Sequence, residues 1–382
     1  MCGFVGFANF NEKIPNKETI LKDMNNTLSR RGPDEEGYYI NDFLGFGHKR
    51  LIVIDPEGGK QPMKETYSFG NFVICYNGQI YNTKELKKDL EENGFDFSTH
   101  SDTEILLKSY IYYGEDVVKH LNGIFAFVIW NSKNQELFFA RDHFGVKPFF
   151  YTYTNNTFIF ASEIKALFKY PGIEKVLDDQ GISELFGIGP AHTPGTTIFK
   201  NIYELKPAHF GIFNRSGIHL KEYWKLVSKE HKDSLGVTCD KIKYLLQDAI
   251  TTQLVSDVPI CTFLSGGLDS SIISKFASDY CKTNGLPPLD TYSIDYVDND
   301  KNFVKSDFQP NSDNYYIDLM NKTLYSNHHK IVIDTPELAD SLEDAMIARD
   351  MPGMADVDSS LLLFCKYVKK EKTVTLTRRM CR

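Results

Sequence analysis

The chain opens with Met1-Cys2-Gly3-Phe4-Val5-Gly6, and this hexapeptide is the best guide to the architecture of its first half. The residues after Cys2 predict a strand, and the glycines leave room for a substrate to approach the thiol. Because Cys2 is small, Met1 can be removed, which leaves an α-amine beside the thiol. That amine titrates at about 7.7–8.0 and the thiol at about 8.5, so the amine can serve as its general base. By itself, a cysteine at position two is better explained as incidental.

Composition narrows the classes of protein. The 382 residues leave room for two or three domains, and 42% hydrophobic and 25% charged residues are ordinary for a globular chain. The net charge of −8 disfavours a nucleic-acid partner. No apolar run reaches the roughly 18–20 residues that span a bilayer, and no secretory signal opens the chain. The seven cysteines include no C-x-x-C pair, which fits a reduced, cytoplasmic setting.

The first 165 or so residues predict an α+β layered domain. The helical segments are Thr83–Asn93 and Ser101–Tyr113, and Ser101 with Glu104 predicts a capping box for the second. The predicted strands are Phe4–Phe10, Phe46–Asp55, Phe72–Tyr76, Ile124–Trp130, Leu137–Ala140, Phe149–Tyr153 and Phe158–Ala161.

Several polar residues of this half are candidates to act with Cys2. Asn77 and Gly78 follow a predicted strand, and a side-chain amide with a backbone N–H can form an oxyanion hole. A hairpin turn is the alternative. Arg50 could clamp a carboxylate with its planar fork, and Asp102 could accept a substrate ammonium. Standing alone, each of these two would be better explained by a surface ion pair.

Six motifs then lie in order over the first 145 residues. They are Met1–Gly6, Arg31-Gly32-Pro33-Asp34, His48-Lys49-Arg50-Leu51, Tyr76-Asn77-Gly78-Gln79-Ile80-Tyr81-Asn82, Ser101-Asp102-Thr103-Glu104 and Ala140-Arg141-Asp142-His143-Phe144-Gly145. Together they resemble the glutaminase domain of class II glutamine amidotransferases. The resemblance implies an N-terminal-nucleophile αββα sandwich that hydrolyses glutamine through a γ-glutamyl thioester.

The same resemblance implies roles for particular residues. Cys2 would be the nucleophile, and Asn77 and Gly78 the oxyanion hole. Arg50 and Asp102 would hold the α-carboxylate and α-amine of glutamine. The further glutamine-binding residues would be Leu51, Ile52, Val53, Ile54 and Gln79. Many members have glutamate at the position of Gln79, so a neutral amide weakens one contact to the α-amine.

The pattern changes after about residue 200. A hairpin is predicted over Leu205–Tyr223 and a polar linker over Lys225–Thr238. Alternating helices and strands follow, which is the βαβ order of a parallel sheet. They are helix Asp240–Val255, strand Pro259–Leu264, helix Leu268–Lys282, strands Thr291–Asp295 and Lys330–Ile333, helices Pro336–Arg349 and Ser359–Lys370, and strand Lys372–Thr377.

A second candidate site follows the buried-strand candidate Pro259–Leu264. The next residues are Ser265-Gly266-Gly267-Leu268-Asp269-Ser270-Ser271, and a helix comes directly after. Glycine backbone, serine hydroxyls and a helix N-terminus together suit a phosphate. The loop lacks the lysine of a Walker A motif, and Asp269 suits a magnesium ion bridging phosphates. The alternative is a plain strand–turn–helix connection that Asp269 caps.

This loop resembles the pyrophosphate loop of the ATP pyrophosphatases. Behind a glutaminase, it looks like the synthetase half of glutamine-hydrolysing asparagine synthetase, and Met351–Ser360 matches one branch of that family. The resemblance places the adenine between Leu264 and Ile294. The implied ATP-binding residues are Leu264, Ser265, Gly266, Gly267, Asp269, Ser270, Ser271 and Ile294.

The whole pattern predicts a glutaminase domain over residues 2–205, a hairpin and linker over 206–238, and an incomplete synthetase domain over 239–382. The expected reaction uses glutamine, aspartate and ATP with Mg²⁺, and no prosthetic group. Ammonia from Cys2 would aminate β-aspartyl-AMP. A homodimer stays compatible with the sequence.

Other enzymes stay open as alternatives. Glucosamine-phosphate synthase shares the glutaminase but lacks a pyrophosphate loop, and a β-lactam synthetase would not need Cys2. A truncated pseudo-synthetase that keeps only glutaminase activity is the third alternative.

The tail bears on that last alternative. After Thr377 the family resemblance calls for Gly-Glu-x-Ala-Asp-Glu, whereas the chain reads Arg378-Arg379-Met380-Cys381-Arg382. One set of codons for this tail, read one base later, gives Gly-Glu-Cys-Ala-Asp. We therefore expect a one-base frameshift in the coding sequence, which would leave asparagine synthesis absent. A solvated basic tail is the other explanation.

Overall fold

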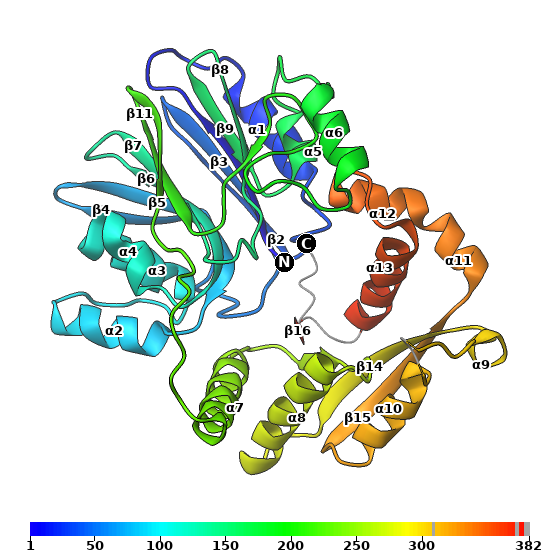
Figure 1. Cartoon of the computed structure of the whole chain (residues 1–382). Helices are drawn as coiled ribbons and strands as arrows, with labels where there is room; N and C mark the ends of the chain where they lie inside the picture. The colour runs from blue at the N-terminus through cyan, green and yellow to red at the C-terminus, as the bar shows by residue number, and fades with distance from the viewer. Residues whose placement is uncertain (308–309, 371–373, 378–382) are drawn as a thin grey trace. The chain divides into compact units, whose positions relative to one another are not determined.

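A computed structural model describes residues 1–307, 310–370 and 374–377. The chain divides into two compact units, one of Met1–Val227 and a second that begins at Ser228 (Figure 1). The predicted tail residues 378–382 and the first residues of the last predicted strand, 372–373, lie outside the described residues.

The first unit contains two six-stranded sheets, and all their pairings are antiparallel. The first sheet has the order β10-β8-β9-β1-β3-β2 and the second β12-β11-β7-β6-β5-β4. The first consists of β1 (Gly3–Ala8), β2 (Glu35–Ile40), β3 (Leu44–Arg50), β8 (Phe150–Thr154), β9 (Thr157–Ala161) and β10 (Tyr203–Glu204). The second consists of β4 (Met63–Tyr67), β5 (Gly70–Ile80), β6 (Gly123–Asn131), β7 (Glu136–Arg141), β11 (His209–Asn214) and β12 (Gly217–Glu222).

Helices cover the outer face of each sheet. Figure 1 shows α1 and α5 beside the first sheet and α2, α3 and α4 beside the second, so the layers run αββα, as the family resemblance implied. The helices are α1 (Lys17–Asn26), α2 (Thr83–Glu92), α3 (Asp102–Tyr113), α4 (Val117–His120), α5 (Ile164–Leu167) and α6 (Asp179–Gly187), with a 3-10 turn at Gly114–Asp116.

An aromatic-rich core fills the space between the two sheets. Phe4 of β1, Phe46 of β3 and Cys75 of β5 belong to it. Successive side chains of a strand point to opposite faces. Positions 2, 48 and 77 therefore lie on the inner faces of the two sheets, at one end of the sandwich. This alternation is what brings the candidate site residues of the first unit together.

The predicted capping box is half wrong. Ser101 caps α3 as expected, because its hydroxyl accepts a hydrogen bond from the Thr103 N–H (3.2 Å). Glu104 does not return to the Ser101 N–H. Its carboxylate accepts from the backbone of Ser98 (2.9 Å) and pairs with Lys108 (2.6 Å). A buried ammonium four residues on is a stronger partner for this carboxylate than a backbone amide.

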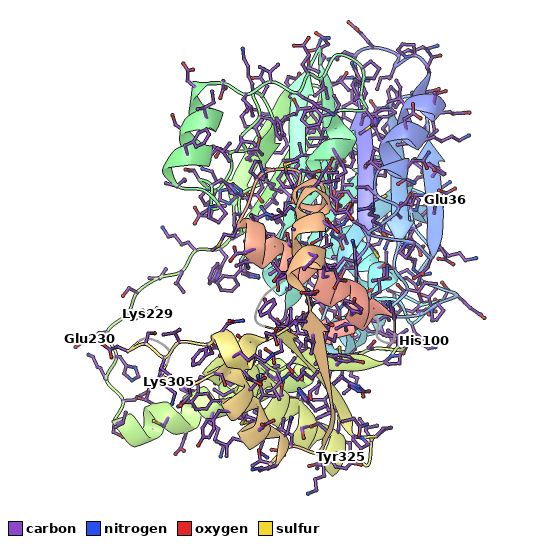
Figure 2. All side chains as sticks on the ribbon, turned by 90° about the vertical axis from the view of Figure 1, so that its right-hand side faces the viewer. Glu36, His100, Lys229, Glu230, Lys305 and Tyr325 are labelled. Carbon is purple, nitrogen blue, oxygen red and sulfur yellow. The ribbon has the colours of Figure 1, made fainter. Side chains whose placement is uncertain are left out.

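The hairpin and linker also differ from the prediction. The sequence grouped the hairpin with the linker, but β11 pairs with β7 and so extends the second sheet. Its apolar side chains explain this, because Phe210 and Phe213 are buried in that unit. The linker is shorter than expected, since α7 begins at Leu235, where the Ser234 hydroxyl accepts from the Val237 N–H. Figure 2 shows Lys229 and Glu230 on the extended stretch that leads into this helix.

The second unit contains a parallel sheet with the order β15-β14-β13-β16, as predicted. Its strands are β13 (Ile260–Phe263), β14 (Leu289–Tyr296), β15 (Ser326–Ile333) and β16 (Val374–Leu376). Its helices are α7 (Leu235–Thr252), α8 (Leu268–Thr283), α9 (Asn299–Asn302), α10 (Asp313–Asn321), α11 (Thr335–Asp340), α12 (Leu342–Arg349) and α13 (Ala355–Lys369).

Helices pack on both faces of this sheet. Ile250 of α7 and Ala277 of α8 form one apolar cluster with Leu289, while Phe364 of α13 forms another with Cys261. The predicted helix Pro336–Arg349 is two helices, because the Ser341 hydroxyl donates to the Leu338 carbonyl (3.0 Å) and ends α11. The sequence pattern did not predict α1, α4, α5, α6, α9, α10, β2, β4 and β10. Within the described ranges, no helix has the length and apolar content to cross a membrane.

Candidate active site

Cys2 lies directly before β1, against the residue that follows β3. Its Sγ is 3.4 Å from the Leu51 N and 3.5 Å from the Leu51 O. This contact follows from the register, which pairs Gly3 with Lys49. The Cys2 carbonyl accepts from the Arg31 Nε at 2.9 Å. Met1 precedes Cys2 here, and its amine donates to the Arg31 carbonyl (3.2 Å).

The motif Arg31–Asp34 holds these parts in place. The buried Arg31 guanidinium pairs with Glu163 at 3.1 Å, which ties the start of β1 to the residue before α5. Asp34 accepts a hydrogen bond from the Ile52 N–H at 2.8 Å. One motif therefore fixes both Cys2 and the segment that touches its thiol.

Asn77 is 1% exposed, and its amide nitrogen has no hydrogen-bond partner among the described residues. A buried amide donor without a partner costs free energy, on the order of 1–3 kcal/mol. Such a group is expected where a ligand supplies the missing acceptor. The prediction that Asn77 serves an oxyanion fits this observation.

The backbone of Gly78 lies on an open edge of β5. Met63, the first residue of β4, pairs with Ile74, so among the described residues no strand pairs with β5 beyond that point on this side. The N–H groups of Tyr76 and Ile80 are taken by side chains, those of Gln61 (2.6 Å) and Asp102 (3.1 Å). Gly78 stands between them in the alternation, so its N–H faces the same edge. A Cβ at Gly78 would lie 2.4 Å from the Ile124 oxygen, so only glycine fits.

Asp102 is buried beside this edge. Its carboxylate accepts from the Tyr76 hydroxyl (2.9 Å) as well as from Ile80. Burial outweighs these hydrogen bonds and raises the pKa of Asp102 to about 6. Burial, the charge of Asp102 and the thiol of Cys2 all raise the pKa of Tyr76. Cys2, Tyr76 and Asp102 are therefore electrostatic neighbours.

The Arg50 guanidinium is also buried, but it faces the chain itself. Nη1 pairs with Glu35 (2.7 Å) and donates to the Pro56 carbonyl (2.9 Å). Nη2 donates to the carbonyls of Ile54 (3.1 Å) and Asp55 (2.6 Å). Four of the five N–H donors of an arginine are thus used. A carboxylate clamp at Arg50 stays a prediction, and it requires one of these contacts to be exchanged.

The other predicted glutamine-binding residues lie close by. Ile52 and Ile54 use their backbones in the contacts above, and Gln79 pairs with Ile124 in the ladder between β5 and β6. Val53 is half-buried. No role was predicted from the sequence for Tyr76 or Gln61. Tyr76 could have been found, because it directly precedes Asn77 in the decisive motif.

The phosphate-type loop lies between β13 and α8 in the second unit. The Ser265 and Ser270 hydroxyls are 3.0 Å apart, and Ser270 also donates to the Gly267 carbonyl (3.1 Å). Gly266 has φ +74°. A Cβ there would lie 2.9 Å from the Asp313 carbonyl oxygen of α10, so this helix packs directly on the loop.

The remaining predicted ATP residues differ in exposure. Asp269 is exposed on the first turn of α8, and Ser271, two residues further on, is half-buried. Leu264 is buried, whereas Ile294 is half-buried and packs with Phe263 against α13. A carboxylate beside phosphates suits Mg²⁺, which keeps most of its waters.

Both units resemble known protein families. Residues 1–224 match the family model described as a glutamine amidotransferase domain, and residues 241–377 match the model described as asparagine synthase. The first match covers more than half of the chain. The chain therefore belongs to the glutamine amidotransferase domain family.

The similar proteins have more specific descriptions than the family models. The chain is 50% identical to asparagine synthetase [glutamine-hydrolyzing] 3 of Bacillus subtilis (strain 168), over 99% of this chain and 61% of that protein. It is 36% identical to asparagine synthetase [glutamine-hydrolyzing] 1 of the same organism, over 78% of this chain and 46% of that protein. A putative asparagine synthetase [glutamine-hydrolyzing] 2 of Methanocaldococcus jannaschii is 34% identical, over 78% and 60%. The chain thus spans about three fifths of the first relative's length.

Proposed function

We propose that this chain hydrolyses glutamine at Cys2 and that the ammonia aminates an ATP-activated aspartate, as in a glutamine-dependent asparagine synthetase. The observation that carries the first half is the buried Asn77 amide, which lacks a partner among the described residues. It lies next to Gly78, whose N–H faces the open edge of β5. The family match over residues 241–377 supports the second half.

The thiolate of Cys2 attacks the side-chain amide carbon of glutamine. The α-amine freed by removal of Met1 takes the thiol proton, directly or through one water, and returns it to the leaving nitrogen. Asn77 and Gly78 donate to the oxyanion of the tetrahedral intermediate. Ammonia leaves, a γ-glutamyl thioester forms, and water then releases glutamate and the thiol.

Charged groups near Cys2 orient the substrate. The Asp102 carboxylate accepts the α-ammonium, and a positive charge beside it favours its ionised form. Arg50 holds the α-carboxylate after exchanging one of its contacts with Glu35 or the 54–56 carbonyls. The backbone of Leu51–Ile54 lines the same side of the site.

In the second unit the Ser265–Ser271 loop binds the phosphates of ATP through hydroxyls and backbone N–H groups. Asp269 would hold a Mg²⁺ ion, which neutralises phosphate charge. The aspartate side-chain carboxylate attacks the α-phosphorus and releases pyrophosphate, and ammonia then displaces AMP to give asparagine. We further propose a cytoplasmic location and no nucleic-acid partner, with a homodimer as the assembly.

The test assays the two half-reactions of the purified chain separately. A complete synthetase gives glutamate from glutamine alone, and pyrophosphate from ATP only when aspartate and Mg²⁺ are present. A frameshift after Thr377 leaves only the first of these activities. Ammonium chloride should replace glutamine in the second assay. An inactive first assay contradicts the glutaminase, whereas an inactive second assay limits this chain to glutamine hydrolysis.

A further inference from the structure

His48 makes a hydrogen bond from one sheet of the sandwich to the other. It lies in β3 and is 0% exposed. Its Nε2 is 3.0 Å from the carbonyl oxygen of Tyr76 in β5. By alternation, His48 shares the inner face of β3 with Phe46, whose ring lies in the core between the sheets. The mechanism above does not use this imidazole.

The Tyr76 backbone needs such a partner because β4 begins only at Met63 and does not extend to the level of Tyr76. In the register that pairs Met63 with Ile74, position 61 would stand opposite Tyr76. No strand residue of β4 pairs there. Instead the Gln61 side-chain oxygen accepts from the Tyr76 N–H (2.6 Å), and His48 serves its carbonyl. The side chains of Gln61 and His48 thus replace a strand partner, so both the N–H and the carbonyl of Tyr76 are hydrogen-bonded.

The bond also defines the state of the imidazole. A carbonyl oxygen only accepts, so Nε2 carries the proton and Nδ1 does not. Nδ1 has no partner among the described residues. Burial lowers the pKa of His48 to about 4, and the nearby charge of Arg50 acts in the same direction. At neutral pH His48 is therefore an uncharged donor with a single acceptor.

Both ends of this bond touch the candidate site. Tyr76 is joined through its carbonyl carbon to the nitrogen of Asn77, so fixing this carbonyl fixes the peptide plane from which Asn77 projects. On the other strand, His48 stands three residues before Leu51, whose backbone contacts the Cys2 thiol. The bond therefore links the nucleophile's side of the site to the side that holds the oxyanion donors.

We propose that His48 is a positioning residue for glutamine hydrolysis, which sets the Asn77–Gly78 donors relative to Cys2 through the Tyr76 carbonyl. The inference rests on the proposed glutaminase activity. Misplacement by about 1 Å can cost about 10²-fold in rate. His48→Leu removes the donor and keeps an apolar side chain, so we expect kcat to fall by about 10- to 100-fold while KM changes by less than about 3-fold.

A conservative variant separates positioning from general loss of structure. The amide nitrogen of His48→Gln reaches about as far as Nε2 and can donate to the same carbonyl. We expect it to restore kcat to within about 5-fold of the unmodified chain. If His48→Leu does not fold, Gln61→Met carries the test, because it removes the partner of the Tyr76 N–H and should show the same defect in kcat.

The matched control is Asn131→Ala. Asn131 lies in β6, at the far end of its pairing with β5, the strand that carries Tyr76. Asn131 is buried opposite Phe72, and its amide donates to the Tyr110 hydroxyl at 3.3 Å. It lies about 13 Å along the sheet from the level of Tyr76. We expect a lower melting temperature with unchanged kcat.

Two outcomes overturn the inference while the unmodified chain is active. One is a folded His48→Leu variant with normal kcat, and the other is a folded His48→Gln variant as slow as His48→Leu. An unmodified chain that does not hydrolyse glutamine overturns the proposed function and this inference together.

Discussion

The two candidate sites are held in different ways. In the first unit, the donors and carboxylates around Cys2 are buried and fixed by side chains from both sheets and from α3. In the second unit, the hydroxyls of the phosphate-type loop are solvent-facing and mostly satisfy one another. A hydrogen-bond donor that is already buried and points at the reacting atom needs no rearrangement when negative charge develops on the substrate. An exposed loop can instead reorganise around its ligand. Substitutions should therefore have larger effects in the first unit.

The strongest test of this difference removes the nucleophile. In Cys2→Ala we expect glutamine hydrolysis to fall by more than about 10⁴-fold, because no covalent step can proceed without the thiol. Ammonia-dependent pyrophosphate release should stay unchanged. Glutamate production is measured against the unmodified chain, and activity that survives in the variant would refute the assignment.

Asn77→Ala should come next in size. An oxyanion donor acts on charge that exists only in the transition state, so we expect kcat to fall by about 10²–10³-fold with KM little changed. Steady-state kinetics measure this split. A variant with normal kcat and raised KM would instead make Asn77 a residue that binds the ground state.

The pH dependence of glutamine hydrolysis should report Asp102. Only the carboxylate attracts the substrate ammonium, and its pKa in the free protein is about 6. We expect kcat/KM to fall as pH drops below 6, by up to about tenfold per pH unit, with an inflection that is absent in Asp102→Asn. The raised pKa also has a stability consequence. The contribution of Asp102 to folding is most favourable below its ordinary pKa and weakens as pH rises through 6.

An inflection near pH 6 that persists in Asp102→Asn would assign that titration to another group. The control is the pH dependence of the melting temperature without glutamine, which should show the same inflection only when Asp102 is present.

The sequence was most informative where a residue type and its neighbours are tied to one chemistry. The six motifs that include the Cys2 hexapeptide and the Asn77-Gly78 pair implied the sandwich through their family resemblance, and the structure places both residues at one end of it. The alternation of β1, β3 and β5 explains why, because it puts positions 2, 48 and 77 on inner faces. In the second unit, the alternating order of helices and strands predicted the parallel sheet.

What the sequence could not predict depends on long-range partners. Glu104 does not complete the capping box because its carboxylate pairs with the buried ammonium of Lys108. The role of Gln61 depends on where β4 begins, and the side-chain partner of Arg50, Glu35, comes from β2, which has no strong strand pattern. Such choices are made between segments distant in the chain, which local spacing does not record.

The smallest effect is expected from Ser270→Ala in the second unit. Its hydroxyl contacts Ser265 and the Gly267 carbonyl across the loop, and these contacts can be exchanged for phosphate oxygens. We expect ATP-dependent pyrophosphate release to weaken by about 3- to 10-fold through KM for ATP, since one hydrogen bond to a charged group is worth about 1.5–3 kcal/mol before solvent replaces it. Glutamine hydrolysis should not change. Thr283→Ala is the matched control, because Thr283 is exposed at the other end of α8, about 20 Å away. A Ser270→Ala variant with normal KM for ATP would show that this hydroxyl serves only the loop. Slower glutamine hydrolysis in the same variant would contradict the independence of the two half-reactions on which the comparison rests.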